Sequence, residues 1–485
     1  MSPNSTSLRH TVSYMQATPT TPGRESSQWD PNWLYQRQLP GRSNMPTSET
    51  QSQSASSMGG GPNAVLLVTA LHAEVTEGRK QEIIDEYLLR AQSLALQSDK
   101  TAQRLVTAGI VPTVILLLKA RAVNATGLEI VLVTLGVLAC DPVTANTIYR
   151  TKTASTLIEI ITSSYSDDIT ALAVWCVNRI CRSAEVAMGL IKEDLAALLI
   201  RKGLRGNRLA SRFSAWCLGS LVFTDSLADT LAAQNVVVTS VQHLRSCTGV
   251  LAADPEDTCA ALFLIARMAR SIPLSKSLAR AGCVPLIVHH LSTSDHPEIL
   301  NWSARAVGCL MRPNSSDMSK ALLDAGSAQA LARLPRVLPT EAIEPLASFA
   351  FAIQRFSCAE WGSGTRKALV DAGVVDSLLA ALRTAAHVPY PQVHVELALA
   401  VSFLGDVGGT AIRKEIVRAG GIEILKQVGA AGKPAVSKAC SMAVTSITGN
   451  LWTRNAASAK TAMTHNWNGG CPEYQPSCPM SLSTE

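Results

Sequence analysis

The 485-residue sequence predicts an all-α array of stacked helical repeats, the fold class called an α-solenoid. Three observations predict it: a recurring turn motif, a regular spacing between its copies, and a composition suited to helices. Hydrophobic residues make up 47% of the chain and aromatic residues only 5%. A repeat array also suits the length, because single hydrophobic cores rarely grow beyond about 250–300 residues.

The recurring motif is a helix that ends at a glycine, followed by a tight turn and a second helix. It is clearest at residues 105–118, Leu-Val-Thr-Ala-Gly-Ile-Val-Pro-Thr-Val-Ile-Leu-Leu-Leu, and at residues 278–291. Glycine tolerates the left-handed backbone that closes a helix, and Pro112 and Pro285 suit the first turn of the next one. We therefore expect left-handed turns at Gly109, Gly282, Gly326, Gly373 and Gly420.

A third helix between successive motifs gives the same period. One of its positions, four residues before an expected groove-facing position, recurs every 41 to 48 residues. That column comprises Val133, Trp175, Trp216, Phe263, Arg305, Phe351, Leu399 and Met442. Degenerate copies of the glycine turn are expected at Lys152, Glu193 and Asn235, and an incomplete first copy at residues 62–98. Armadillo and HEAT arrays have a period of roughly 40–47 residues.

On these motifs, and on helices such as residues 213–221 (Phe-Ser-Ala-Trp-Cys-Leu-Gly-Ser-Leu), the chain resembles the armadillo-repeat family over residues 62–455. The resemblance implies a right-handed superhelix of about eight to nine repeats, with three helices in each. The third helices would line a concave groove. We expect a disordered tail rich in Ser, Thr and Pro at residues 1–61 and a flexible tail at residues 456–485.

The expected groove departs from one branch of that family. Armadillo grooves typically offer one asparagine per repeat to an extended peptide, and the importin-α branch adds a tryptophan four residues earlier. Trp175 and Trp216 resemble that tryptophan column. The asparagine column is instead occupied by Val137, Arg179, Ser220, Arg267, Cys309, Arg355, Phe403 and Ser446. The N-terminal segment also lacks the basic autoinhibitory run of importin-α, so these departures argue against binding of Lys/Arg-rich signals.

Arginine is what replaces much of the asparagine column. We predict a partner-binding groove formed by Trp175, Arg179, Arg182, Trp216, Ser220, Phe263, Arg267, Arg270, Arg305, Arg312, Phe351 and Arg355. No Asp or Glu occupies the same columns between the second and sixth repeats, so the groove would attract acidic or phosphorylated segments by bidentate pairing. In charge it resembles β-catenin-type grooves. The alternative is that these arginines cover a solvated face or extend between repeats.

The sequence gives no sign of catalysis. Residues 58–62 are rich in glycine but lack the Lys-Ser/Thr of a phosphate-binding loop, and His289 and His290 lie within one predicted helix. Most of the twelve cysteines fall in apolar helical segments, where buried, reduced thiols are expected. We therefore predict no enzyme activity, no catalytic residue, no metal site and no cofactor.

Two further features bear on partners. No apolar run reaches the roughly 18 residues of a spanning helix, so no membrane insertion is expected. The net charge is +6 with no run of five basic residues, so neither nucleic acid nor a small-molecule substrate is expected.

The sequence therefore favours a protein–protein interaction scaffold that binds an extended acidic or phosphorylated partner segment. A divergent importin-α-like nuclear transport adaptor and a structural component of a cytoskeletal or axonemal assembly remain alternatives. The expected location is the cytoplasm, with cytoskeletal and nuclear locations also open. Within the N-terminal tail, residues 29–35 (Trp-Asp-Pro-Asn-Trp-Leu-Tyr) form an apolar island for which a docking role and an inert one are both open.

Overall fold

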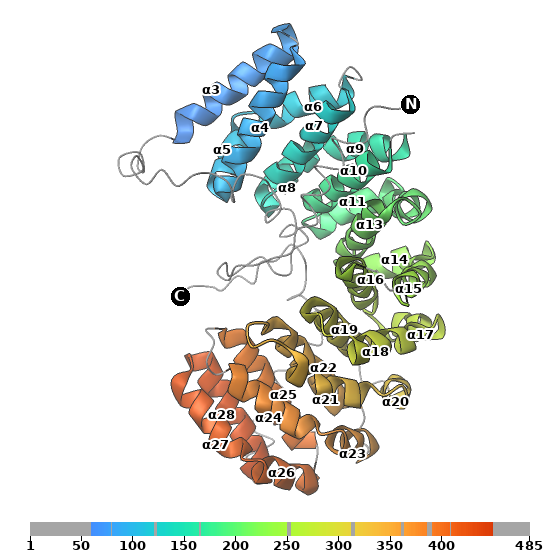
Figure 1. The fold of residues 1–485 in the computed structure, drawn as a ribbon, viewed down its shortest axis with the longest axis vertical. Coiled ribbons are helices and arrows are strands. Elements are labelled where there is room, and N and C mark those ends of the chain that lie inside the picture. Colours follow the sequence, from blue (N-terminus) through green and yellow to red (C-terminus); the bar gives the residue numbers. More distant parts are fainter. Residues whose placement is uncertain are drawn as a thin grey trace. The chain divides into compact units, whose positions relative to one another are not determined.

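The computed structural model describes residues 60–449, apart from 79, 121–123, 164–165, 250–253, 312–315, 360–362, 386–389 and 408. Every regular element in this part of the chain is a helix (Figure 1). The predicted all-α solenoid is therefore confirmed. The tail boundaries near residues 61 and 456 lie at or beyond the edges of this part and stay predictions.

The described helices from α5 onward form eight repeats of three helices. The first helices of the repeats are α5 (Asp99–Thr107), α8 (Pro142–Arg150), α11 (Ala184–Lys192), α14 (Asp225–Ala233), α17 (Ile272–Arg280), α20 (Ser316–Asp324), α23 (Ser363–Asp371) and α26 (Gly409–Arg418). The second helices are α6 (Ile110–Lys119), α9 (Thr153–Thr162), α12 (Leu195–Leu198) with the π-helical turn η2 (Leu199–Gly203), α15 (Val236–Cys247), α18 (Cys283–Thr293), α21 (Ser327–Val337), α24 (Val374–Ala385) and α27 (Gly421–Ala431).

The third helices complete the repeats. They are α7 (Ala125–Leu138), α10 (Asp167–Ile180), α13 (Arg208–Ser220), α16 (Pro255–Met268), α19 (Pro297–Leu310), α22 (Glu344–Ala359), α25 (Pro391–Val407) and α28 (Pro434–Thr448). An incomplete copy precedes them, formed by α3 (Gly60–Ala73), the π-helical turn η1 (Glu74–Gly78) and α4 (Gln81–Gln97). The expectation of eight to nine repeats agrees with this count within the described residues.

The start of each first helix is set by its N-cap residue. In the first five repeats a side-chain oxygen of this residue accepts a backbone N–H from the first turn, which satisfies one of the donors left over at a helix start. These N-caps are Ser98, Asp141, Ser183, Thr224 and Ser271.

The left-handed turns follow the first helices. φ is +91° at Gly109, +94° at Gly282, +90° at Gly326, +80° at Gly373 and +77° at Gly420, so all five glycine turns are confirmed. Of the degenerate copies, Lys152 and Asn235 are also left-handed, with φ of +60° and +65°.

The prediction for Glu193 was wrong by one residue. Glu193 has φ of −85° and caps the C-terminus of α11, while Asp194 is the left-handed residue, with φ of +60°. Asp reaches this conformation more readily than most residues, which explains why the turn closes there.

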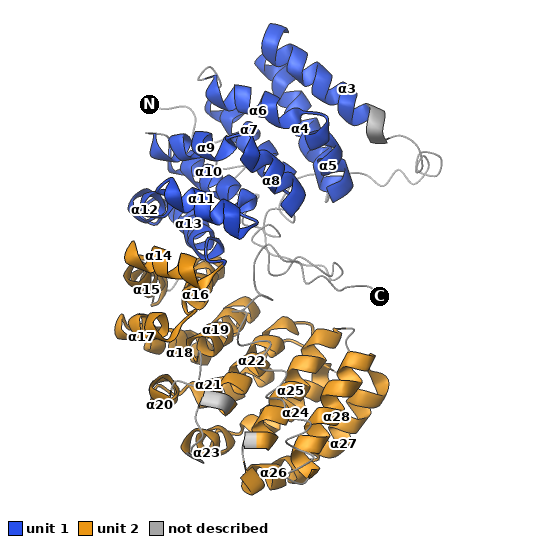
Figure 2. Cartoon of the chain, turned by 180° about the vertical axis from the view of Figure 1, so that it is seen from behind, with its two compact units in different colours: residues 1–223, 472–485 blue, residues 224–471 orange. Residues whose placement is uncertain are grey.

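The chain forms two compact units, residues 1–223 with 472–485, and residues 224–471 (Figure 2). In unit 1 the third helices α4, α7, α10 and α13 pack in that order. In unit 2 the same is true of α16, α19, α22, α25 and α28. Each third helix is therefore covered by its neighbours, and every residue from Ile299 to Leu310 of α19 is buried. Burial against neighbouring repeats is what stabilises such an array.

Candidate binding face of the third helices

Eleven of the twelve predicted groove residues lie on third helices or in the turns that follow them. Unit 1 holds Trp175 and Arg179 on α10, Arg182 just after it, and Trp216 and Ser220 on α13. Unit 2 holds Phe263 and Arg267 on α16, Arg270 just after it, Arg305 on α19, and Phe351 and Arg355 on α22. Arg312 lies outside the described residues. The helix assignment of the columns was therefore right, whereas their role in binding stays a prediction.

Arg179 connects α10 to the preceding third helix. Its Nε donates a hydrogen bond of 2.8 Å to the carbonyl oxygen of Gly136 on α7, and its guanidinium carbon lies 5.7 Å from the ring centroid of Trp175. Trp175 in turn covers Gly136 so closely that a Cβ there would lie 1.8 Å from Cζ3 of the indole. Arg179 and Trp175 are 2% and 1% exposed. This aromatic–arginine pair therefore holds two repeats together.

Phe351 forms a second contact of this kind in unit 2. The guanidinium carbons of Arg305 and Arg355 lie 4.3 Å and 4.9 Å from its ring centroid. A Cβ on Gly308 of α19 would lie 2.4 Å from Cδ1 of Phe351, so the glycine makes room for the ring. Both arginines are buried. Cation–π contacts that exclude water contribute about 2 kcal/mol each, so this cluster also stabilises an interface between repeats.

Phe263 and Arg267 occupy the same two columns on α16. Phe263 is fully buried and packs edge-on against Trp302 of α19, with ring centroids 4.9 Å apart and an angle of 83° between the planes. Trp302 is 3% exposed and belongs to the core of unit 2. Arg267 is buried beside them at 4% exposure.

Arg182 and Arg270, which follow α10 and α16, also have polar partners. Nε of Arg182 donates a 3.0 Å hydrogen bond to the carbonyl of Arg179, and Nε of Arg270 forms a 2.7 Å ion pair with Asp225. On α13, Ser220 is buried, and its carbonyl accepts a long contact of 3.8 Å from the Cys181 thiol. We call Arg179, Arg267, Arg305 and Arg355 the inner arginines.

Sequence reasoning missed a second set of arginines, on the second helices of unit 2. We call them the outer arginines: Arg245, Arg336 and Arg383. Each is exposed, and Nη2 lies 3.1, 3.7 and 4.0 Å from the Cβ position of the next repeat's left-handed glycine. Nη2 of Arg245 also donates a 3.4 Å hydrogen bond to the carbonyl of Ala281, where α17 ends. Positive charge at a helix C-terminus is favourable because the last carbonyls carry partial negative charge.

A regular spacing could have identified the outer arginines. Each lies ten residues after the left-handed residue of its own repeat and 37 residues before that of the next. The glycines that Trp175 and Phe351 cover could also have been identified from the sequence. Gly136 and Gly308 each come immediately before a position of the expected groove column, Val137 and Cys309.

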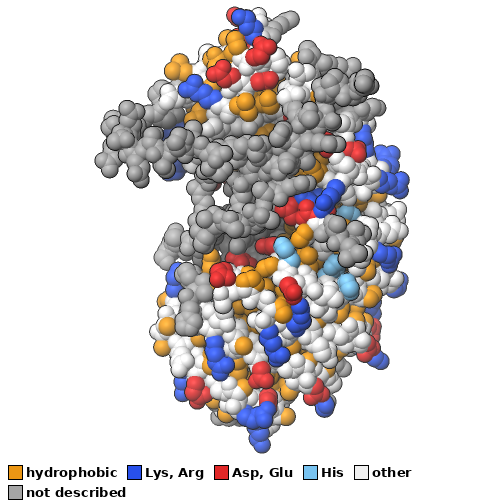
Figure 3. All heavy atoms as spheres, in the orientation of Figure 1, with side chains coloured by type: hydrophobic (Ala, Val, Ile, Leu, Met, Phe, Trp, Pro, Cys, Tyr) orange, Lys and Arg blue, Asp and Glu red, His pale blue; other side chains and the backbone are white. Residues whose placement is uncertain are grey.

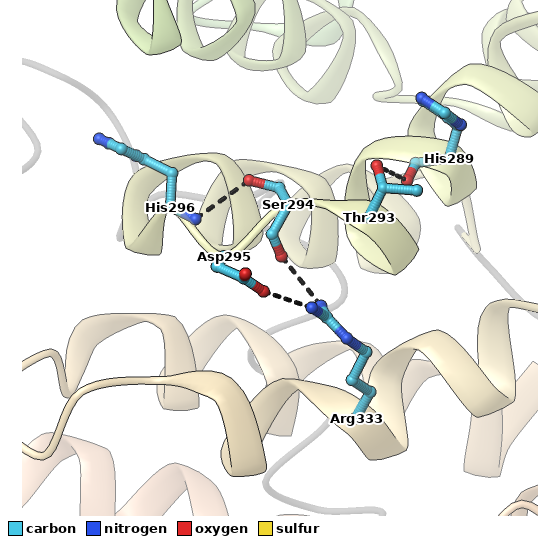
Figure 4. A network of polar contacts seen from close by, with 6 residues as sticks. All are labelled: His289, Thr293, Ser294, Asp295, His296 and Arg333. Atoms are coloured by element: carbon cyan, nitrogen blue, oxygen red, sulfur yellow. Dashed lines mark hydrogen bonds and ion pairs between the residues drawn. The ribbon is translucent and has the colours of Figure 1, made fainter.

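The loop between α18 and α19 contains a network of polar contacts (Figure 4). Nη1 of Arg333, from α21, donates a 2.9 Å hydrogen bond to the carbonyl of Ser294, and Nη2 pairs with the carboxylate of Asp295. The backbone N–H of His296 donates to Oγ of Ser294 at 3.1 Å. In Figure 4 the imidazoles of His289 and His296 point away from the Asp295–Arg333 pair. The network therefore fixes a loop and assembles no acid–base pair.

Burial makes several of the described cysteine thiols poor nucleophiles by raising their pKa. Nine cysteines whose side chains the structure describes are free, and burial raises the pKa of Cys140 to about 12 and that of Cys440 to about 11. A thiol that stays protonated at neutral pH is a poor nucleophile and a poor metal ligand. Among the described residues, no group of three His, Cys, Asp or Glu side chains is arranged to hold a metal ion.

A helix that crosses a membrane must be long and apolar. No single described helix is long and apolar enough to cross a membrane, whereas α5 and α6, bent by 72° from each other, meet the length and composition criteria as a pair.

Known structures give a consistent picture of the fold. No protein-family model and no curated protein matches the sequence. A solved structure of an engineered protein aligns with 80% of this chain and 99% of its own length, at 20% identity and a TM-score of 0.51. A match of this extent supports the helical-repeat architecture described above. The chain has an armadillo-like repeat fold.

Two designed armadillo repeat proteins are also similar, one of them solved in complex with the peptide (KR)4. Each covers 52% of this chain and 98% of its own, at 16% identity and a TM-score of 0.43. An armadillo-like array typically serves as a protein-binding scaffold, because stacking repeats creates one long continuous surface.

Proposed function

We propose that this armadillo-like chain is a non-catalytic scaffold that binds an extended acidic segment of a partner protein along its third helices. The observation that carries the proposal is the arginine column at Arg179, Arg267 and Arg355, one on every second third helix. No carboxylate occupies the same column. A ring one turn earlier on the same helix holds each of Arg179 and Arg355 in place, and the carbonyl of Gly136 on the preceding third helix also holds Arg179. Binding would therefore cost little of their side-chain entropy.

Electrostatics supports an acidic partner. Charges that are partly buried are screened by salt much less than charges in open solvent. The inner arginines therefore make the electrostatic potential at the third helices more positive even where their side chains are covered. We also propose a cytoplasmic location, which the free and mostly buried cysteines support because disulfides are rare in reducing compartments.

The test compares two matched peptides. A fluorescent peptide of about twelve residues that alternates Glu with apolar residues is titrated with the full chain, and a second peptide carries Lys in place of Glu. We expect binding of the acidic peptide only, weakened several-fold between about 50 and 300 mM salt. Binding of the Lys peptide alone would favour the transport-adaptor alternative, and binding of neither would favour a structural component.

A variant pair locates the binding. Because Arg355 and Arg267 are only 5% and 4% exposed, glutamate at either position would disturb the interior, so glutamine is the better replacement. We expect Arg355→Gln to weaken the acidic peptide by roughly tenfold, and the exposed Arg383→Gln to leave it unchanged. Arg355→Lys should recover part of the loss. Melting temperatures and helicity of each variant separate lost binding from lost fold.

A further inference from the structure

The N-terminal end of unit 1 exposes apolar side chains where a terminal repeat is expected to be polar. On α3 the exposed fraction is 55% for Val65 and 67% for Leu66, and on the neighbouring α4 it is 51% for Leu89. Figure 3 shows hydrophobic side chains at this end, next to acidic and basic ones. Terminal repeats usually present a polar outer face, because nothing further stacks on them. Glu82 and Glu86 fit that expectation and these three residues do not.

The exposure of Val65 and Leu66 follows from how α3 packs. The helix takes the place of a second helix, in contact with α4, α5 and α6. It buries one stripe, formed by Ala64, Leu67, Val68 and Leu71. Val65 and Leu66 fall outside this stripe, because residues that share a helix face recur every three or four positions. We call Val65 and Leu66, the large exposed apolar residues of α3, the end face.

We propose that residues 29–35 of this same chain dock on the end face. That segment, Trp-Asp-Pro-Asn-Trp-Leu-Tyr, combines four large apolar or aromatic side chains with a single charged one, Asp30. Each aromatic side chain can bury roughly 150–250 Å², so it matches an apolar surface better than an acidic or basic one. This docking is separate from the partner binding proposed above, which concerns the third helices.

The chain connection favours this occupant over others. About 24 residues separate Tyr35 from Gly60, where α3 begins. A flexible connection of that length has a root-mean-square span of roughly 25–30 Å. The 14 residues of α3 extend over only about 21 Å, so the segment reaches every part of the end face. Tethering at this length gives an effective concentration near the millimolar range, which favours the intramolecular partner.

Proteolysis of the full chain tests the docking. Chymotrypsin cleavage after Tyr35 is timed by mass spectrometry for the unmutated protein and for Leu66→Glu, which places a charge in the end face. We expect cleavage about tenfold faster in Leu66→Glu, the ratio given by an effective concentration of ~1 mM and a dissociation constant of ~0.1 mM. Val238→Glu is the matched control, since Val238 is a 49%-exposed apolar residue on α15 of unit 2. It should leave the rate unchanged.

Two further measurements decide the outcome. A labelled peptide of residues 24–40 should bind the full chain carrying Trp29→Ala and Trp33→Ala, and should lose that binding when Leu66→Glu is added. Protection should also be independent of protein concentration. Equal cleavage rates in the unmutated chain and Leu66→Glu, with both folded by melting temperature, overturn the proposal. Protection that rises with concentration overturns it too, because a second copy would then be the occupant.

Discussion

The inner arginines lie on third helices and the outer arginines on second helices, and the two sets have opposite surroundings. Arg179 and Arg355 are buried against a ring of their own helix, and Arg305 against Phe351 of the adjacent third helix. Arg179 also donates a hydrogen bond to Gly136 of the preceding third helix. Arg245 and Arg383 are exposed beside the end of the next repeat's first helix. Both sets connect one repeat to another, one through the interior and the other at the surface. Recurrence at a fixed spacing therefore identifies contacts between repeats, but burial decides what each arginine contributes.

The largest effect is expected where an inner arginine and its ring meet a glycine. Gly136→Ala would bring a Cβ to 1.8 Å from the Trp175 indole, so the ring must move away from α7. We expect a loss of about 3 kcal/mol in the free energy of unfolding, measured by urea denaturation. Gly364→Ala on α23, where no atom lies within 4 Å, is the control and should be neutral or slightly stabilising. Equal effects would disprove the close packing.

The comparison itself is tested by removing one arginine of each kind. Arg179→Gln loses a hydrogen bond to Gly136 and a cation–π contact in a buried place, so we expect a cost of about 2 kcal/mol. Arg383→Gln removes only an exposed charge near Gly420 and should cost less than about 0.5 kcal/mol. Similar losses in thermal melts of the two variants would mean that burial does not separate the two sets.

The left-handed turns come next. Gly282→Val and Gly373→Val place a β-branched residue at φ of +94° and +80°, a conformation that such residues avoid. We expect each to destabilise the fold by about 1–3 kcal/mol in the same melts. A Cβ on Gly282 would also lie 3.1 Å from Nη2 of Arg245, so Gly282→Val should lose more stability than Gly373→Val. The reverse order would indicate that the outer arginine moves away easily.

At the left-handed turn formed by Lys152, substitution by glycine should raise the stability rather than lower it. Lys152 holds φ of +60°, where an L-residue costs about 1–2 kcal/mol. Replacing Lys152 by glycine removes this cost, but part of the stabilisation is lost because glycine makes the unfolded chain more flexible. Lys152→Gly should therefore raise the free energy of unfolding by about 0.5–1 kcal/mol. Asn235→Gly should change it less, since Asn tolerates this conformation, and a destabilised Lys152→Gly would contradict the assignment of strain.

The smallest effect at neutral pH concerns two adjacent histidines with different burial. Burial, and then the neighbouring His289, lowers the pKa of His290 to about 4, and its Nε2 lies 2.8 Å from Oγ1 of Thr248. As the pH falls from about 6.5 towards 4, the unfolded chain binds a proton that the folded chain does not. The stability that comes from keeping His290 neutral is therefore fully present above about pH 6.5 and is lost as the pH falls towards 4.

His290→Gln should flatten that decline in melting temperature between pH 7 and 4.5. The exposed His289→Gln should leave its slope nearly unchanged. A slope that is the same in His290→Gln as in the unmutated protein would show that the decline has another source.

The sequence predicted the repeat well because its signals are local. A glycine at a helix end needs no knowledge of neighbours, and five of five such turns were confirmed, whereas Glu193 was wrong by one residue because Lys, Asp and Asn leave a weaker signal. The position of Arg179 on a third helix was also predictable. Its burial was not, since it depends on Gly136, which lies 43 residues earlier and becomes its neighbour only when repeats stack.

The alternation of glycine and arginine also sets the unit by which this array can change in length. Gly136, Gly219 and Gly308 belong to the odd-numbered repeats, while Arg179, Arg267 and Arg355 recur at intervals of 88 residues on the even-numbered ones. Loss of the single repeat that contains Gly308, for example, would bring Phe351 against α16, which has Ala266 at the position that corresponds to Gly308. Insertions and deletions of two repeats preserve the match. Within the first six repeats, we therefore expect the pair of repeats to be the unit that can be added or removed while keeping the contacts between rings and glycines.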